Sequence, residues 1–134
     1  MLITIAPGCA SLSTSKAAAW APYRQLCTPL SNTQPPADER SRARTLFNTD
    51  ILFASASGKQ RTMNLLPGLA HVQCPVLVMA GEQDPVTPLA DAQEIAAAIP
   101  APWGRLVTFA NAGHGAWRDE PEAAMALIRS FVID

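Results

Sequence analysis

The stretch that decides the fold lies past the middle of the chain and reads Pro75-Val76-Leu77-Val78-Met79-Ala80-Gly81-Glu82-Gln83-Asp84-Pro85-Val86-Thr87-Pro88. Its first part is a continuous apolar run with β-branched members between a proline and a glycine, which is typical of a strand buried on both faces of a parallel sheet. The polar residues that follow predict a loop. A helix is expected next over Leu89–Ile99, because apolar residues recur on one face until Pro100 ends the pattern.

The same order of elements is repeated toward the C-terminus. Arg105–Phe109 predicts a second strand, Asn111–Gly115 a second loop, and Pro121–Val132 an amphipathic helix. A proline in the first turn of that helix is harmless, since its missing N–H would have no partner there. This order predicts a parallel β-α-β unit followed by one more helix, and therefore an α/β fold.

Two polar side chains, Asp84 and His114, each follow the carboxyl end of a predicted strand. Functional groups in open parallel sheets gather at that end, and neighbouring strands lie only about 5 Å apart. We therefore expect the carboxylate and the imidazole to meet in a hydrogen bond that would orient the ring and stabilise its protonated form. Alone, Asp84 would be interpreted as a helix cap or turn residue; its register with His114 favours an acid and base pair.

A resemblance to a known superfamily rests on these residues together. Residues 75–88, the loop Asn111-Ala112-Gly113-His114-Gly115 and the run Asp119-Glu120-Pro121-Glu122 resemble the closing third of the α/β-hydrolases. Within that superfamily they are most similar to the proline-iminopeptidase, enol-lactonase and small-esterase group. The resemblance implies that Asp84 and His114 are the catalytic acid and base of a Ser-His-Asp hydrolase of esters, lactones or amides. It implies no cofactor and no metal ion.

The resemblance also implies a division of the chain into three parts. Residues 1–15 would form a strand and loop of the hydrolase core, with Leu2–Ala6 as the strand after the nucleophile turn. Residues 16–70 would form a helical segment like the cap that covers a hydrolase active site, and residues 71–134 the C-terminal β-α-β-α part of the core. The expected architecture is thus a partial α/β-hydrolase fold with a cap segment.

The nucleophile is the part of the pattern that the chain lacks. An α/β-hydrolase carries its serine on a Gly-x-Ser-x-Gly turn, because only small flanking residues tolerate the sharp bend, and no such motif occurs in the 134 residues. Cys9 stands in the right chain order, but Pro7 and Ser11 occupy positions where the bend needs glycine, so a buried or loop thiol is expected. A whole domain of this type has roughly 250 residues, so we expect the chain to be a C-terminal part that is inactive unaided.

Other polar and aromatic residues receive plainer interpretations. Trp103 and Trp117 are expected to cover the sheet edge, and Trp117, three residues after His114, is also the candidate for lining a substrate pocket. Asp119 is expected to pair with Arg118 or to cap the last helix. His71, just before the first of these strands, is expected to be a surface or core-edge histidine.

Composition limits the partners and the compartment. A net charge of -1, from 10 Lys and Arg against 11 Asp and Glu, provides no positive field for nucleic acid. The three cysteines, Cys9, Cys27 and Cys74, have no regular spacing, which predicts neither a disulfide framework nor a zinc site and favours a reduced, cytoplasmic setting. No apolar run approaches the roughly 18 residues of a membrane span, so no membrane partner is expected.

Two classes of function stay open. In the first, the chain belongs to a serine hydrolase of small-molecule esters, lactones or amides, and an N-terminal half supplies the serine. In the second, it is a non-catalytic remnant or self-associating module that pairs with another chain through an exposed sheet edge at Leu2–Ala6. Either class predicts a homo-oligomer or a complementing chain.

Overall fold

The computed structural model describes residues 22–23, 25–35 and 62–133, and between them residues 43–44, 48, 50–51, 54 and 58. The predicted strand Leu2–Ala6 and Cys9 therefore lie outside the described residues. The chain divides into two compact units: Ser31–Pro35 together with Leu65–Asp134 form one, here called the core unit, and the remaining residues form the other. In the other unit, the described residues include a 3-10 helix, η1, over Thr28–Leu30.

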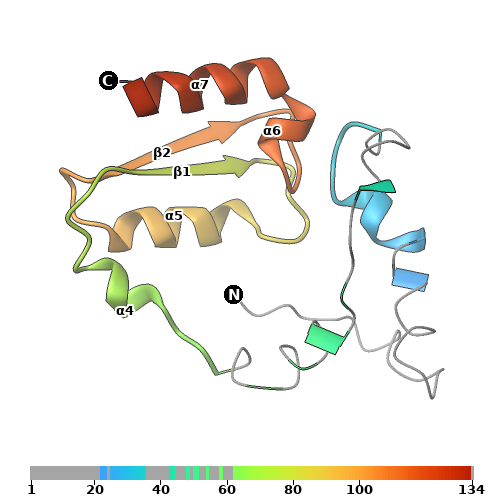
Figure 1. Ribbon diagram of the computed structural model, residues 1–134, viewed down its shortest axis with the longest axis horizontal. Helices are drawn as coiled ribbons and strands as arrows, with labels where there is room; N and C mark the ends of the chain where they lie inside the picture. The colour runs from blue at the N-terminus through green and yellow to red at the C-terminus, as the bar shows by residue number, and fades with distance from the viewer. Residues whose placement is uncertain are drawn as a thin grey trace. The chain divides into compact units, whose positions relative to one another are not determined.

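The core unit is built on two parallel strands, β1 (Val76–Gly81) and β2 (Gly104–Phe109). They pair in register from Val76 opposite Gly104 to Gly81 opposite Phe109, so both end at the same level. Helix α5 (Leu89–Ala98) connects them, and α7 (Pro121–Ile133) follows. Figure 1 shows α5 on one face of the sheet and α7 on the other, which confirms the predicted α/β class.

The boundaries of the elements follow local chemistry. Each strand is one residue longer than predicted, because Gly81 and Gly104 extend the pairing. Helix α5 ends one residue early, since Ile99 turns to extended backbone ahead of Pro100 and is buried. Two short helices complete the unit, α4 (Leu66–Leu69) before β1 and α6 (Ala116–Asp119) between β2 and α7. Helix α6 was not predicted, because four residues carry too little periodicity to be recognised.

The hydrophobic core lies beneath the loop that carries His114. Its buried members are Phe109, Ala112, Ala116 and Ala124, and Met79, Val107 and Leu127 pack against them. Ala112 and Ala116 stand on either side of His114 in the chain, so this loop is fixed to the core at both ends. Close packing leaves few alternative positions for such a loop.

Most of the residues that precede Leu65 lie outside the described part of the chain. The cap-like segment 16–70 and the strand and loop 1–15 fall largely outside the described residues and stay predictions. In the part of the chain that the structure describes, no helix has both the length and the apolar character needed to cross a bilayer.

Candidate active site

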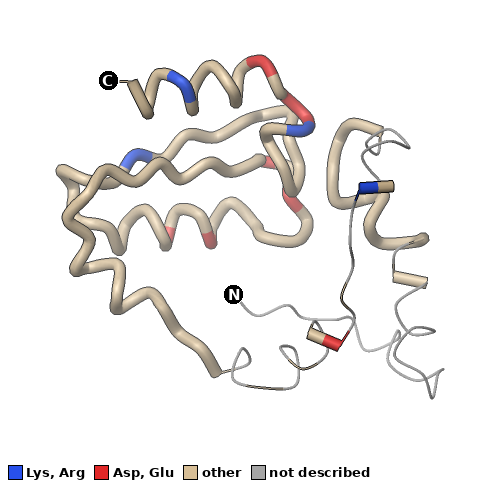
Figure 2. Tube along the Cα trace, in the orientation of Figure 1, with Lys and Arg blue, Asp and Glu red and all other residues tan. Residues whose placement is uncertain are grey.

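The two strands deliver their loops to one edge of the sheet, and hydrogen bonds hold these loops together. The amide of Glu82 donates to the carbonyl of Phe109 at 3.0 Å, and the amide of Gln83 to the carbonyl of Ala112 at 3.0 Å. The side chain of Gln83 adds a bond of 2.8 Å to the carbonyl of Ala110. These bonds make the loops after β1 and β2 one connected structure. Acidic residues gather at the same end of the sheet, as Figure 2 shows.

Gly81 permits the close approach of these loops. A Cβ atom at this position would overlap the carbonyl oxygens of Ala112 and Gly113. Because these are backbone atoms, they could move only by shifting the whole loop that carries His114. Glycine is thus the residue that fits at the end of β1.

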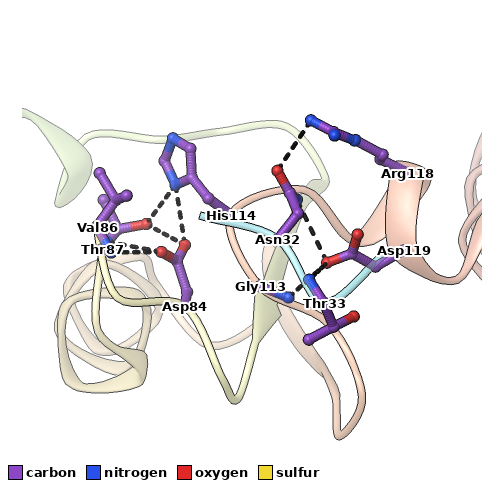
Figure 3. A network of polar contacts seen from close by, with 9 residues as sticks. All are labelled: Asn32, Thr33, Asp84, Val86, Thr87, Gly113, His114, Arg118 and Asp119. Carbon is purple, nitrogen blue, oxygen red and sulfur yellow. Dashed lines mark hydrogen bonds and ion pairs between the residues drawn. The ribbon is translucent and has the colours of Figure 1, made fainter. Parts of the chain in front are cut away.

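Asp84 and His114 meet as expected from the sequence. The Nδ1 atom of His114 lies 3.0 Å from Oδ2 of Asp84 (Figure 3). The side chain of Asp84 is 7% exposed, and that of His114 is 43% exposed. The carboxylate is therefore withdrawn from water while the imidazole reaches the surface, and Nε2 is the ring nitrogen that does not contact Asp84.

The carboxylate of Asp84 is anchored by the turn that follows it. Its Oδ1 accepts hydrogen bonds from the amides of Val86 at 2.7 Å and Thr87 at 2.9 Å, and its Oδ2 accepts one from the Thr87 hydroxyl at 2.5 Å. Burial raises the pKa of Asp84, but the hydrogen bonds from Thr87, His114 and Val86 outweigh it and hold the pKa below its ordinary value. Asp84 is thus both a turn residue and the ionised partner of the imidazole.

Thr87 is a site residue that the sequence analysis did not identify. Besides donating to Asp84, its hydroxyl oxygen lies 3.3 Å from Nδ1 of His114. The sequence signal that could have identified Thr87 is its position three residues after Asp84. At this spacing an aspartate side chain commonly bonds the backbone of the turn that follows it.

A second carboxylate, Asp119, is buried beside the other end of the His114 loop. It is 6% exposed. Its Oδ2 accepts from the amides of Gly113 at 2.7 Å and Thr33 at 2.9 Å and from the amide group of Asn32 at 3.3 Å, while Oδ1 accepts from the Gln34 amide at 3.3 Å. Burial raises the pKa of Asp119, but these hydrogen bonds outweigh it and lower the pKa overall.

The role predicted for Asp119 is therefore wrong. Asp119 is the last residue of α6, and the bonds that its carboxylate accepts come from Gly113 and residues 32–34 rather than from Arg118 or the last helix. Arg118 instead donates to the side-chain oxygen of Asn32 at 3.0 Å and to the carbonyl of Pro35 at 3.3 Å. The physical reason is that two segments close in space offer amide donors that no pattern within residues 116–122 reveals.

Residues 31–35, here called the strap, cross the core unit next to His114. The amide of His114 donates to the carbonyl of Ser31 at 2.6 Å, and the hydroxyl of Thr33 donates to the carbonyl of Asn111 at 2.5 Å. The flanking residues, up to Leu30 and from Pro36, belong to the other unit. Sequence reasoning assigned this stretch to the cap segment and did not identify it as part of the site.

The other candidate residues stand apart from this network. Trp117 lies on α6 and is 61% exposed. Its cover of the sheet edge and its contact with substrate both stay predictions. His71 is exposed, as expected. Among the described residues, no three His, Cys, Asp or Glu side chains gather closely enough to hold a metal ion.

The sequence profile of the TAP-like protein family matches residues 13–134 of the chain. The chain belongs to this family. As a TAP-like chain it is also similar to a curated α/β-hydrolase, the AB hydrolase superfamily protein YisY of Bacillus subtilis (strain 168), with 37% identity over 71 residues. The predicted α/β-hydrolase relationship is thereby confirmed.

Two solved structures share the fold of this TAP-like chain. The esterase EaEST from Exiguobacterium antarcticum superposes with a TM-score of 0.63 at 23% identity and covers 78% of the chain. Est816, described as an N-acyl homoserine lactone degrading enzyme, superposes with a TM-score of 0.62 at 23% identity and covers 90%. The chain spans 26% of YisY, 40% of the esterase and 52% of Est816.

Proposed function

We propose that this chain supplies the acid and the base of a Ser-His-Asp hydrolase that cleaves ester, lactone or amide bonds. An N-terminal half, in the same polypeptide or in a second one, supplies the serine. The observation that carries the proposal is the 3.0 Å contact between Nδ1 of His114 and Oδ2 of Asp84. This contact leaves a surface-accessible imidazole with an anionic partner, which is what activation of a serine requires.

The proposed reaction has two halves that use the same groups. Nε2 of His114 takes the proton of the serine hydroxyl while the serine oxygen attacks the carbonyl carbon. His114 then gives that proton to the leaving alcohol or amine, and an acyl-serine is formed. Water, deprotonated by His114 in turn, attacks the acyl carbon and releases the acid, and the serine regains its proton. Throughout, Asp84 accepts the hydrogen bond from Nδ1–H and stabilises the imidazolium.

Preorganisation of the acid supports this assignment. The carboxylate of Asp84 is held by two backbone amides and one hydroxyl before it meets His114. It therefore needs little reorganisation when positive charge develops on the ring, which is the condition under which a buried charge is most effective.

The names of the two similar structures support the class of bond that we propose the hydrolase cleaves. One is an esterase and the other is described as degrading N-acyl homoserine lactones. Both names refer to substrates with an acyl group bonded to oxygen, and an N-acyl homoserine lactone also carries an amide. The fold likeness adds support for acyl transfer but does not choose among ester, lactone and amide.

A chimera provides the direct test of the proposal. The part of the Exiguobacterium antarcticum esterase that matches this chain is replaced by the chain, so that the remainder of the esterase supplies the other strands of the sheet. We expect turnover of an aryl ester and labelling by a fluorophosphonate probe. Asp84→Asn should lower kcat about ten-thousandfold, and His114→Ala should lower it at least as much.

His71→Ala is the matched control, because His71 is the other histidine of the chain and is exposed. Its turnover should equal that of the unsubstituted chimera. Circular dichroism of each variant separates loss of chemistry from loss of fold. A folded His114→Ala chimera with unchanged turnover would exclude His114 as the base.

The self-association alternative remains a prediction. Its proposed interface, Leu2–Ala6, lies outside the described residues. Light scattering of the chain at micromolar concentration tests it, and a monomer would contradict it.

A further inference from the structure

Asp119 is a buried charged residue, 6% exposed, that the proposed reaction does not use. In Figure 3 it lies on the side of the His114 loop away from Asp84. A buried carboxylate is costly unless donors surround it. Asp119 has four, and all of them belong either to the His114 loop or to the strap.

The strap and Asp119 together hold the His114 loop at three backbone atoms. The carbonyl of Asn111 accepts from Thr33, the amide of Gly113 donates to Asp119, and the amide of His114 donates to Ser31. The last two are consecutive amides. They orient two successive peptide groups, Ala112–Gly113 and Gly113–His114, and with them the direction in which the His114 side chain leaves the backbone.

The strap lies against the loop without space for a side chain at Gly113. A Cβ atom there would overlap the carbonyl oxygen of Ser31 and would stand 2.9 Å from Cα of Asn32. The Ser31 carbonyl, which accepts the hydrogen bond from the His114 amide, thus packs directly against the loop. Its position depends on what holds the neighbouring residues 32–34. The carboxylate of Asp119 accepts a hydrogen bond from each of the three, and Arg118 and the Asn111 carbonyl add one bond each.

We propose that Asp119 is a positioning residue for His114, an inference that rests on the proposed role of His114 as the base. Asp119 holds the strap, the strap places the Ser31 carbonyl over the His114 amide, and the amide sets the ring so that Nδ1 faces Asp84. The ring itself is not touched by Asp119. The assignment accounts for a buried charge that packing alone would not require.

The carboxylate form is needed because all four partners are donors. Three of them converge on Oδ2 and the fourth meets Oδ1. An asparagine keeps one acceptor oxygen for the three and turns its NH₂ group toward the Gln34 amide, so it removes part of the network. An alanine removes all of it and leaves the amides of Gly113 and Thr33 without this acceptor.

The experiment uses the full 134-residue chain, labelled with ¹⁵N, and observes the proton on Nδ1 of His114 by NMR. In the native chain we expect a strongly deshielded, slowly exchanging signal, which Asp84→Asn abolishes. Asp119→Ala should abolish or shift that signal. It should also raise the exchange rate of the His114 amide by about tenfold or more, since the Ser31 carbonyl that accepts from this amide is no longer held in place. Asp119→Asn should have a smaller effect of the same kind.

Glu122→Gln is the matched control, because Glu122 is an exposed carboxylate in the first turn of α7. It should leave both signals unchanged. All spectra are recorded well below the unfolding midpoint of each variant, so that a mere loss of stability does not move the Nδ1 proton.

The outcomes separate this inference from the proposed function. A native chain without the Nδ1 signal would contradict the Asp84–His114 pair itself. A native chain with the signal, and a folded Asp119→Ala variant that retains it unchanged, would overturn the positioning role alone. If Asp119→Ala does not fold, Asp119→Asn and Asn32→Ala decide, because each removes only part of the network; an unchanged Nδ1 signal in both would overturn the inference.

Discussion

Thr87 and His114 contact the same oxygen atom of the Asp84 carboxylate. The Thr87 hydroxyl donates to Oδ2 at 2.5 Å, Nδ1 of His114 stands 3.0 Å from it, and the hydroxyl and Nδ1 are 3.3 Å apart. The hydroxyl therefore fixes the oxygen that the imidazole needs. It also donates to the same negatively charged oxygen that would stabilise the imidazolium.

Thr87→Val tests that relationship with little change of volume. We expect the free energy of unfolding to fall by about 1.5 to 3 kcal/mol, because one hydrogen bond to a buried, ionised carboxylate is lost. The pKa of Asp84 should rise, since the largest of its lowering contacts comes from this hydroxyl. Urea unfolding and carboxyl ¹³C titration by NMR measure the two effects.

Thr108→Val is the matched control for Thr87→Val. Thr108 also donates its hydroxyl to a carboxylate, that of Glu82 at 2.8 Å, but this contact is exposed. We expect a change within roughly 0.5 kcal/mol. Equal effects of the two substitutions would show that burial of Asp84 adds nothing to the bond from Thr87.

Stability should fall in acid because Asp84 and Asp119 have lowered pKa values in the folded chain. The unfolded chain then binds more protons than the folded one at low pH, so unfolding takes up protons there. The stabilisation is fully present above the ordinary aspartate pKa of about 3.9. It is lost as the pH falls through the lower, folded values.

Asp84→Asn and Asp119→Asn should each weaken the chain at neutral pH and flatten this acid dependence. The measurement is the free energy of unfolding by urea at a series of pH values from neutral to acid. The gap between the native chain and each variant should close as the pH falls. A gap that stays constant with pH would mean that the two carboxyls are not held in their ionised form by folding.

Gly81→Ala and Gly68→Ala should change stability in opposite directions. At Gly81 the new methyl group would overlap two backbone oxygens of the His114 loop, so we expect a loss of about 1 to 3 kcal/mol or more. At Gly68, in α4, nothing lies within 4 Å of the added atom. Alanine should there stabilise the helix by roughly 0.5 to 1 kcal/mol. Thermal unfolding of the two variants provides the comparison.

The 134-residue chain alone should not turn over an aryl ester or react with a fluorophosphonate, because it contains no Gly-x-Ser-x-Gly turn. Both assays use the purified chain. Cys9→Ala should change neither result. Robust turnover that Cys9→Ala abolishes would instead identify a thiol nucleophile and contradict the proposed source of the serine.

The β-α-β-α part of the fold could be predicted from the sequence because its signals are local. A run such as Val76–Ala80 between proline and glycine allows few structures, and a proline ends the helix pattern at Pro100. The pairing of Asp84 with His114 could be predicted for the same reason. Parallel strands carry their loops to one edge, so two positions in the chain translate directly into proximity.

The strap and the role of Asp119 could not be predicted, because their signals are not local. The bonds between residues 32–34 and Asp119 join positions 85 to 87 residues apart, and most of the donors are backbone amides that every residue type possesses. A side-chain pattern therefore carries no trace of them. The near neighbour Arg118 suggested an ion pair, but its guanidinium bonds Asn32 instead, and four other donors converge on the carboxylate.

The strap also has a consequence for how sequence variation in this chain is interpreted. Residues 31–35 look like a polar linker in a stretch rich in proline, where substitutions are normally tolerated. Because the Ser31 carbonyl accepts from the backbone amide of His114, a change that lengthens, shortens or stiffens this linker acts directly on the residue that we propose as the base. Variants in residues 31–35 should therefore lower the proposed activity as substitutions in the site itself would. They would do so although they lie far from His114 along the polypeptide and alter none of the proposed reacting groups.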